Sequence, residues 1–76
     1  LLLPLKWIGQ YNDLDSVADS GFGYHTGTPN GFFINVSHET NANYQWQIKT
    51  DDKGSILQLR TKTKTWNEWK NLILKI

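Results

Sequence analysis

The amino-acid sequence predicts a mainly β protein, folded as a small antiparallel β-sheet or partly closed meander with a short N-terminal turn or 3₁₀ segment. Apolar and polar residues alternate in short runs, which is the period of a half-buried strand. Clusters of Gly, Asn and Asp separate these runs, and no periodic stretch reaches the length of a helix. The 76 residues are enough for one domain with a thin core.

The first predicted elements are a turn-rich segment and a strand. Residues 12–19 (Asn-Asp-Leu-Asp-Ser-Val-Ala-Asp) contain Asx and N-cap residue types, with Leu14 and Val17 three positions apart, as in one helical turn. We therefore expect a short turn or 3₁₀ piece there. A strand is expected over 21–26, and the sequence Gly-Thr-Pro-Asn-Gly at 27–31 predicts a hairpin connection to the next strand.

The next two strands have the clearest alternation. Over 32–37, one face carries Phe32, Ile34 and Val36, and the other carries Phe33, Asn35 and Ser37. After a polar loop at 38–42, a strand over 43–49 alternates an apolar set, Tyr44, Trp46 and Ile48, with a polar set, Asn43, Gln45, Gln47 and Lys49. We expect Phe32, Ile34, Val36 and Trp46 to pack in the core and the amide side chains to face solvent.

The C-terminal part predicts a second hairpin. The turn sequence Asp-Asp-Lys-Gly at 51–54 ends on Gly54, which suits a left-handed conformation, and a strand follows over 55–61. Alternating Thr and Lys at 61–65 indicate that this strand continues along a sheet edge. The tail fits two periods, a helical one for Trp66, Trp69, Leu72 and Ile73 and a strand one for Leu72, Leu74 and Ile76.

The composition and charge of the chain argue against several classes of protein. Residues 1–11 are interpreted as a linker or inter-domain segment and 12–76 as the domain; the lack of any Met suggests a piece of a longer polypeptide. The opening leucines are too few for a signal peptide, and no run approaches the roughly 18 apolar residues of a membrane span. The formal net charge of +1 disfavours nucleic-acid binding. With 0 Cys the redox compartment stays open, and self-association is the expected support for so small a core.

Several motifs follow one another in an order that resembles the pyocin-knob-like domains of bacteriophage tail fibres and R-type bacteriocin fibres. They are Asp-Leu at 13–14, Gly-Phe-Gly-Tyr at 21–24, Pro-Asn-Gly at 29–31, the strand with Gln45 and Gln47, the acidic Gly turn at 51–54, Arg60, and Trp-Asn-Glu-Trp-Lys-Asn-Leu at 66–72. The resemblance covers residues 12–73. The sequence departs from it at Gln58, where the family often places an aromatic residue.

The resemblance implies a compact antiparallel fold repeated around a trimeric fibre. Its setting would be an extracellular virion or phage-tail-like particle, and its partners a bacterial cell-surface glycan and the other chains of a homotrimer, without nucleic acid or membrane insertion. Contact residues vary within the family, so the resemblance assigns no binding residue to this chain.

Aromatic residues make up 13% of the chain, and they suit both core packing and the apolar faces of sugar rings. We interpret Trp46, Trp66 and Trp69 as structural. Arg60 is expected to lie across one of the two C-terminal indoles as a cation–π or hydrogen-bonding partner.

The candidate ligand-binding residues are mostly neutral and polar. The amides of Asn43, Gln45 and Gln47 can each donate and accept hydrogen bonds, as recognition of sugar hydroxyls requires, although a solvated sheet surface explains them as well. Tyr11, Tyr24 and His25 are expected to border such a groove, with His25 as a donor; turn-side or partly buried positions are the alternative.

The sequence contains no convergent catalytic set, and we expect neither enzymatic activity nor a metal or cofactor. In Ser37-His38-Glu39, neighbouring side chains of a strand end point apart and cannot form a triad. Asp51-Asp52 belongs to a turn that favours Asp. His25 and His38 alone cannot complete a zinc site, and the glycines lack the Lys-Ser/Thr ending of a phosphate-binding loop.

The leading hypothesis is a non-catalytic tail-fibre knob module that attaches to bacterial surface polysaccharide, with avidity from several copies. A structural or trimerising fibre segment without receptor contact is one alternative, favoured by the leucine-rich start and the apolar tail. An SH3-like cell-wall-binding module of a hydrolase is another. An OB-type nucleic-acid binder would require a basic groove that the charge balance does not supply.

Overall fold

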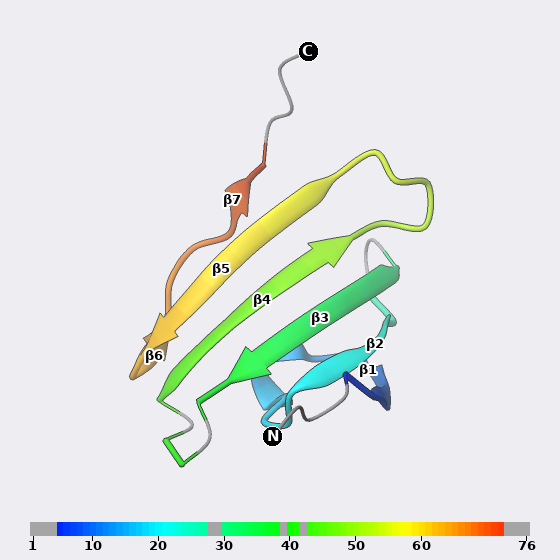
Figure 1. Ribbon diagram of the computed structural model, residues 1–76. Helices are drawn as coiled ribbons and strands as arrows, with labels where there is room; N and C mark the ends of the chain where they lie inside the picture. The colour runs from blue at the N-terminus through cyan, green and yellow to red at the C-terminus, as the bar shows by residue number, and fades with distance from the viewer. Residues whose placement is uncertain (1–4, 28–29, 39, 42, 73–76) are drawn as a thin grey trace.

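A computed structural model describes residues 5–27, 30–38, 40–41 and 43–72, which form one open β-sheet (Figure 1). The strand order is β1-β2-β3-β4-β5-β6, and β7 also pairs with β5. The strands are β1 (Trp7–Tyr11), β2 (Gly21–His25), β3 (Gly31–Ser37), β4 (Tyr44–Thr50), β5 (Leu57–Thr63), β6 (Thr65–Trp66) and β7 (Lys70–Asn71). The predicted mainly β fold is confirmed.

A single turn of 3₁₀ helix, Leu14–Ser16, lies between β1 and β2, as predicted. Asp13 caps it, because its Oδ1 accepts a hydrogen bond from the Asp15 backbone N–H at 2.9 Å. The tail from Trp66 forms the short strands β6 and β7. The leucines at 1–3, Pro29 of the predicted turn, and Ile73, Leu74 and Ile76 lie outside the described residues.

Strand β1 was not expected, since its residues were assigned to a linker. It pairs in parallel with β2, which makes the sheet mixed where a purely antiparallel one was predicted. The strand escapes sequence analysis because its alternation is broken: the register shifts between Trp7 and Gly9, and Gly9 has a φ of +103°. The sheet therefore includes residues 7–11.

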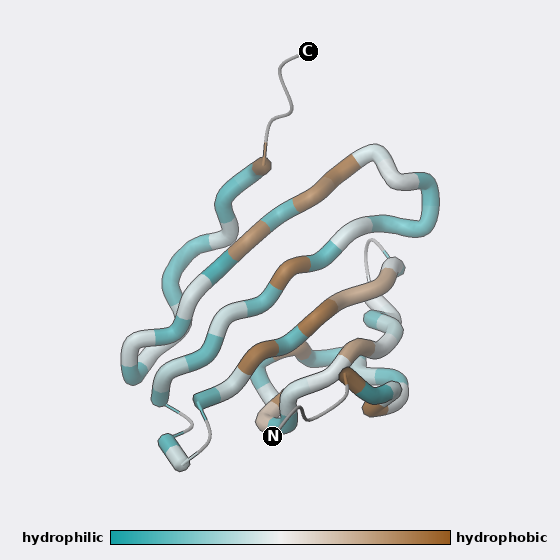
Figure 2. Tube along the Cα trace, in the orientation of Figure 1, coloured by the Kyte–Doolittle hydropathy of each residue, from teal (hydrophilic) through white to brown (hydrophobic). Residues whose placement is uncertain are grey.

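The regular pairing of β2 to β5 divides these strands into two faces, and hydrophobic and hydrophilic residues alternate along them (Figure 2). We call the first the outer face; it carries Phe22, Tyr24, Phe32, Ile34, Val36, Tyr44, Trp46, Ile48, Thr50, Leu57, Leu59, Thr61 and Thr63. The inner face carries Gly21, Gly23, His25, Gly31, Phe33, Asn35, Ser37, Gln45, Gln47, Lys49, Gln58, Arg60 and Lys62.

The predicted orientation of the sheet is wrong: the inner face, which carries the amides, is the buried one. Asn35 and Gln47 are 0% exposed and Gln45 is 4% exposed, whereas Phe32 is 53% and Trp46 44% exposed. The alternation was correctly recognised, but hydropathy alone assigned the apolar face to the core.

The reason for this inversion is the segment between β1 and β2, which covers the inner face. Its Leu14 and Val17 pack with Phe33 in the buried core. Its backbone carbonyls then need donors, because a crossing segment has no ladder partner. Gln47 Nε2 donates to the Leu14 carbonyl at 2.8 Å, and Asn35 Nδ2 donates to the Asp19 carbonyl at 2.9 Å. The buried amides thus hold the crossing segment on the sheet.

Candidate functional site

A buried polar network begins at Gln47 and reaches the surface at Asp15. Arg60 Nε donates to Gln47 Oε1 at 2.9 Å, and Arg60 Nη2 forms an ion pair with Asp15 Oδ1 at 2.7 Å. Arg60 is buried, while the Asp15 side chain is largely exposed. A buried charge requires both a counter-charge and hydrogen bonds. Asp15 supplies the counter-charge and Gln47 a hydrogen bond to Nε, while Nη2 lies beside the carboxylate without a hydrogen bond of good geometry.

Two indoles of the C-terminal segment close over this network. The Arg60 guanidinium lies 3.9 Å from the ring centre of Trp66 and 4.6 Å from that of Trp69. The predicted stacking of Arg60 on an indole is therefore confirmed. Lys49 Nζ lies 4.3 Å from the centre of the same Trp69 ring, so two cations lie against one indole.

A polar pocket of about 170 Å³ opens beside Trp69 on the inner-face side of the sheet. It is lined by Asn12, Asp13, Leu14, Asp15, His25, Lys49, Arg60 and Trp69. The segment before the 3₁₀ helix contributes the amide of Asn12 and the carboxylate of Asp13, and the helix itself contributes the carboxylate of Asp15. Strands β2, β4 and β5 contribute an imidazole and two cations. The volume is below the roughly 300 Å³ at which pockets for drug-sized ligands begin, so the pocket suits a group the size of one sugar ring.

The Lys49 ammonium is the unpaired cation of this pocket. Burial, and then the nearby Arg60 charge, lower the pKa of Lys49 below its ordinary value. Arg60 has Asp15, but no carboxylate lies within ion-pairing distance of Lys49 among the described residues. An anionic group bound here would relieve the repulsion between the two cations.

The six candidate residues named from the sequence are not brought together in one site, although Tyr11 and His25 pair across β1 and β2. Tyr11 is half-buried, and its ring packs edge-on to Phe33 with 5.8 Å between centroids. Tyr24 lies on the outer face, where its hydroxyl donates to Asp52 Oδ2 at 2.5 Å. This hydrogen bond, followed by burial and the Asp52 charge, raises the pKa of Tyr24. Asn43 is exposed in the connection between β3 and β4.

Of the six candidates, only His25 lines the polar pocket. Gln45 and Gln47 are buried, so the predicted outward-facing amide surface does not exist. Sequence reasoning missed Asn12, Asp13, Asp15 and Lys49. The Asx-rich run at 12–19 was a signal for the first three, but it was interpreted as turn chemistry alone.

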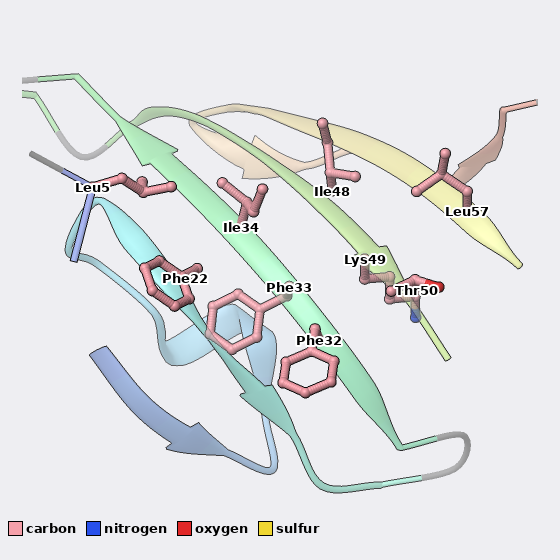
Figure 3. A pocket seen from close by; sticks show the side chains of 9 residues that line it. All are labelled: Leu5, Phe22, Phe32, Phe33, Ile34, Ile48, Lys49, Thr50 and Leu57. Carbon is pink, nitrogen blue, oxygen red and sulfur yellow. The ribbon is translucent and has the colours of Figure 1, made fainter. Parts of the chain in front are cut away.

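Two further hollows lie over the outer face. One has a volume of about 320 Å³ and is lined mainly by apolar residues; Figure 3 shows Ile34, Ile48 and Leu57 on one side of neighbouring strands. The other, of about 370 Å³, is lined by Val36, Ser37, His38, Tyr44, Gln45, Trp46, Thr61 and Lys62. Trp46, predicted to be structural, is therefore a surface residue.

Within the described ranges, no three His, Cys, Asp or Glu side chains are grouped closely enough to hold a metal ion. No helix among these residues has the length and apolar character needed to cross a membrane. Comparisons of the chain with protein-family models, curated protein sequences and solved structures found no match.

Proposed function

We propose that this chain is a non-catalytic, knob-like attachment module that binds bacterial surface polysaccharide through the polar pocket beside Trp69. The observation that carries the proposal is the convergence of an indole with Lys49, His25 and two carboxylates in a pocket of single-ring size. A sugar ring needs an apolar surface for its C–H face and mixed donors and acceptors for its hydroxyls. The motif order that resembles tail-fibre knobs supplies the setting, an extracellular fibre with several copies of the module.

The unpaired ammonium of Lys49 favours an acidic sugar as the bound residue. A uronate or similar carboxylate would pair with Lys49. The Asp13 carboxylate would accept hydrogen bonds from neighbouring sugar hydroxyls, and the Asn12 amide would donate hydrogen bonds to them. Single-site binding of this kind is weak, and attachment then depends on several copies acting together.

The test compares binding of wild type and variants to acidic and neutral bacterial polysaccharides, displayed on an array. Lys49→Met removes the charge and keeps the length of the side chain. We expect it to weaken binding to the acidic polysaccharides about ten- to a hundredfold, the effect of losing one charged hydrogen bond. Lys53→Met is the matched control, because Lys53 lies exposed in the turn between β4 and β5.

Two results would reject this site. One is the absence of binding to any polysaccharide or to intact bacteria by multivalent wild-type protein. The other is binding to the acidic polysaccharides that is unchanged in Lys49→Met, which would place the site outside the polar pocket.

A structural role without receptor contact is favoured by a different observation, the uncharged outer face of the sheet. A structural role of the outer face does not by itself exclude glycan binding, since the pocket lies on the inner-face side; the absence of all polysaccharide binding would leave the structural role alone. The open sheet argues against an SH3-like cell-wall-binding module, since SH3-like folds are small barrels.

A further inference from the structure

We propose that the outer face of the sheet is buried against the outer face of further copies of this chain. All 13 of its residues are uncharged, although Lys, Arg, Asp and Glu make up 20% of the sequence. Phe22, Ile34, Ile48 and Leu59 form one continuous row across four strands, and Val36, Trp46 and Thr61 form the next row. Such a face is typical of a sheet packed on another sheet.

The exposed apolar area matches the size of a protein–protein interface. Phe32, Tyr44 and Trp46 are 53%, 50% and 44% exposed, which leaves roughly 100 Å² of each aromatic residue accessible to solvent. With Ile34, Leu57 and the flanking Leu5 and Trp7, the accessible apolar area reaches roughly 600 Å² per copy, against about 800 Å² per partner in a standard interface.

The absence of charge on strands β2 to β5 points to another copy as the occupant. The Asp52 carboxylate bonded to Tyr24 and Lys70 beside Leu59 stand at the border of this uncharged area. A partner that placed a charged residue on this face would bury it without a counter-charge, which is strongly unfavourable. The outer face is itself an uncharged apolar surface of matching extent. Its large aromatic residues stand beside Thr50, Thr61 and Thr63, so large and small side chains of two facing sheets can interdigitate.

The small core makes this association useful to the fold. Among the described residues, the fully buried hydrophobic side chains are Leu14, Val17 and Phe33. Chains of this size without disulfides commonly gain stability by association. The net charge of +1 leaves little electrostatic repulsion between copies.

Analytical ultracentrifugation over a wide concentration range, up to about 0.5 mM, tests the proposal. We expect a reversible dimer or trimer for the wild type. Ile34→Glu and, independently, Trp46→Glu place a charge in the proposed interface and should raise the dissociation constant at least about a hundredfold. Both residues are exposed in the single chain, and circular dichroism should show that the variants keep their β structure.

Ala18→Glu is the control, since Ala18 is exposed in the segment between β1 and β2, which covers the opposite, inner face. It should leave association unchanged. A wild-type chain that stays monomeric at the highest concentration overturns the proposal. So does association that persists in both folded interface variants, or that is lost equally in Ala18→Glu. These outcomes are independent of glycan binding, because Lys49 lies on the inner face.

Discussion

Arg60 connects more parts of the molecule than any other side chain described above. It binds Gln47 of β4 and Asp15 of the 3₁₀ helix, and it stacks on Trp66 and Trp69 of the C-terminal segment. A guanidinium suits this position because its planar fork can donate in several directions while its face packs on a ring. The crossing segment and the tail are therefore attached to the sheet through one residue.

Replacing Arg60 with Met should lower the free energy of unfolding by about 2–4 kcal/mol, because Gln47 Oε1 loses its donor in a buried site. Chemical denaturation measures this loss. Lys64→Met, an exposed lysine between β5 and β6, should change stability by less than about 0.5 kcal/mol. Equal losses in the two variants would contradict the role given to Arg60.

Asp51 gives the molecule an acid-sensitive turn. Its carboxylate accepts hydrogen bonds from the Ser55 hydroxyl and from the backbone N–H groups of Ser55 and Ile56. The Ser55 hydrogen bond is the largest cause that lowers the pKa of Asp51 below its ordinary value of 3.8. In this turn, the folded state therefore holds the charged carboxylate more strongly than the unfolded state does.

Because the folded pKa is the lower one, the stabilisation is present above pH 3.8 and is lost as the pH falls through the folded pKa. Thermal unfolding between neutral pH and acid should show this loss in wild type. In Asp51→Asn the loss should be smaller, since the side chain no longer titrates. Ser55→Ala, which removes the largest cause of the lowered pKa of Asp51, should also make the loss smaller. An unchanged profile in Asp51→Asn would contradict the assignment.

At the level of elements, the parallel pair β1–β2 depends on close backbone approach at Gly23. A Cβ atom there would lie 2.3 Å from the Gly9 carbonyl oxygen and 2.9 Å from the Phe33 ring. Strand β1 and the core ring can therefore approach β2 together only if residue 23 has no side chain.

Gly23→Ala should cost about 2–3 kcal/mol of stability, since either β1 or Phe33 must move. Hydrogen exchange should show the amides of β1 losing protection first. In Gly27→Ala the added methyl would meet only the His25 ring, at 3.0 Å, so a much smaller effect is expected. A Gly23→Ala protein of unchanged stability, with the β1 amides still protected, would show that the pairing of β1 with β2 does not require a residue without a side chain at position 23.

The strands that could be predicted are those with uninterrupted alternation, such as β3 and β4. The inward-facing side could not be predicted, because Gln47 and Asn35 are buried by a segment more than fifteen residues away in sequence whose carbonyls they bind. The polar pocket could not be predicted from the sequence for a similar reason. It joins Asp13, His25, Lys49 and Trp69 from four separate segments, and no local spacing connects them.

At the level of the whole molecule, the two faces of the sheet have separate tasks. The inner face binds the crossing segment and positions the polar pocket, while the outer face offers an uncharged apolar surface. If copies pack through their outer faces, their pockets point away from the assembly. A surface carrying many sugars could then be contacted at several sites at once, which increases avidity without stronger single contacts.

The inverted orientation of the sheet is the claim on which this account depends. Carbene footprinting read by mass spectrometry tests it directly, on protein dilute enough to be monomeric. The account predicts heavy labelling of Phe32, Ile34 and Trp46 and protection of Val17, Phe33 and Gln47. Protection of Phe32, Ile34 and Trp46 together with labelling of Gln47 would show that the apolar face is the core of the single chain, and would contradict the account.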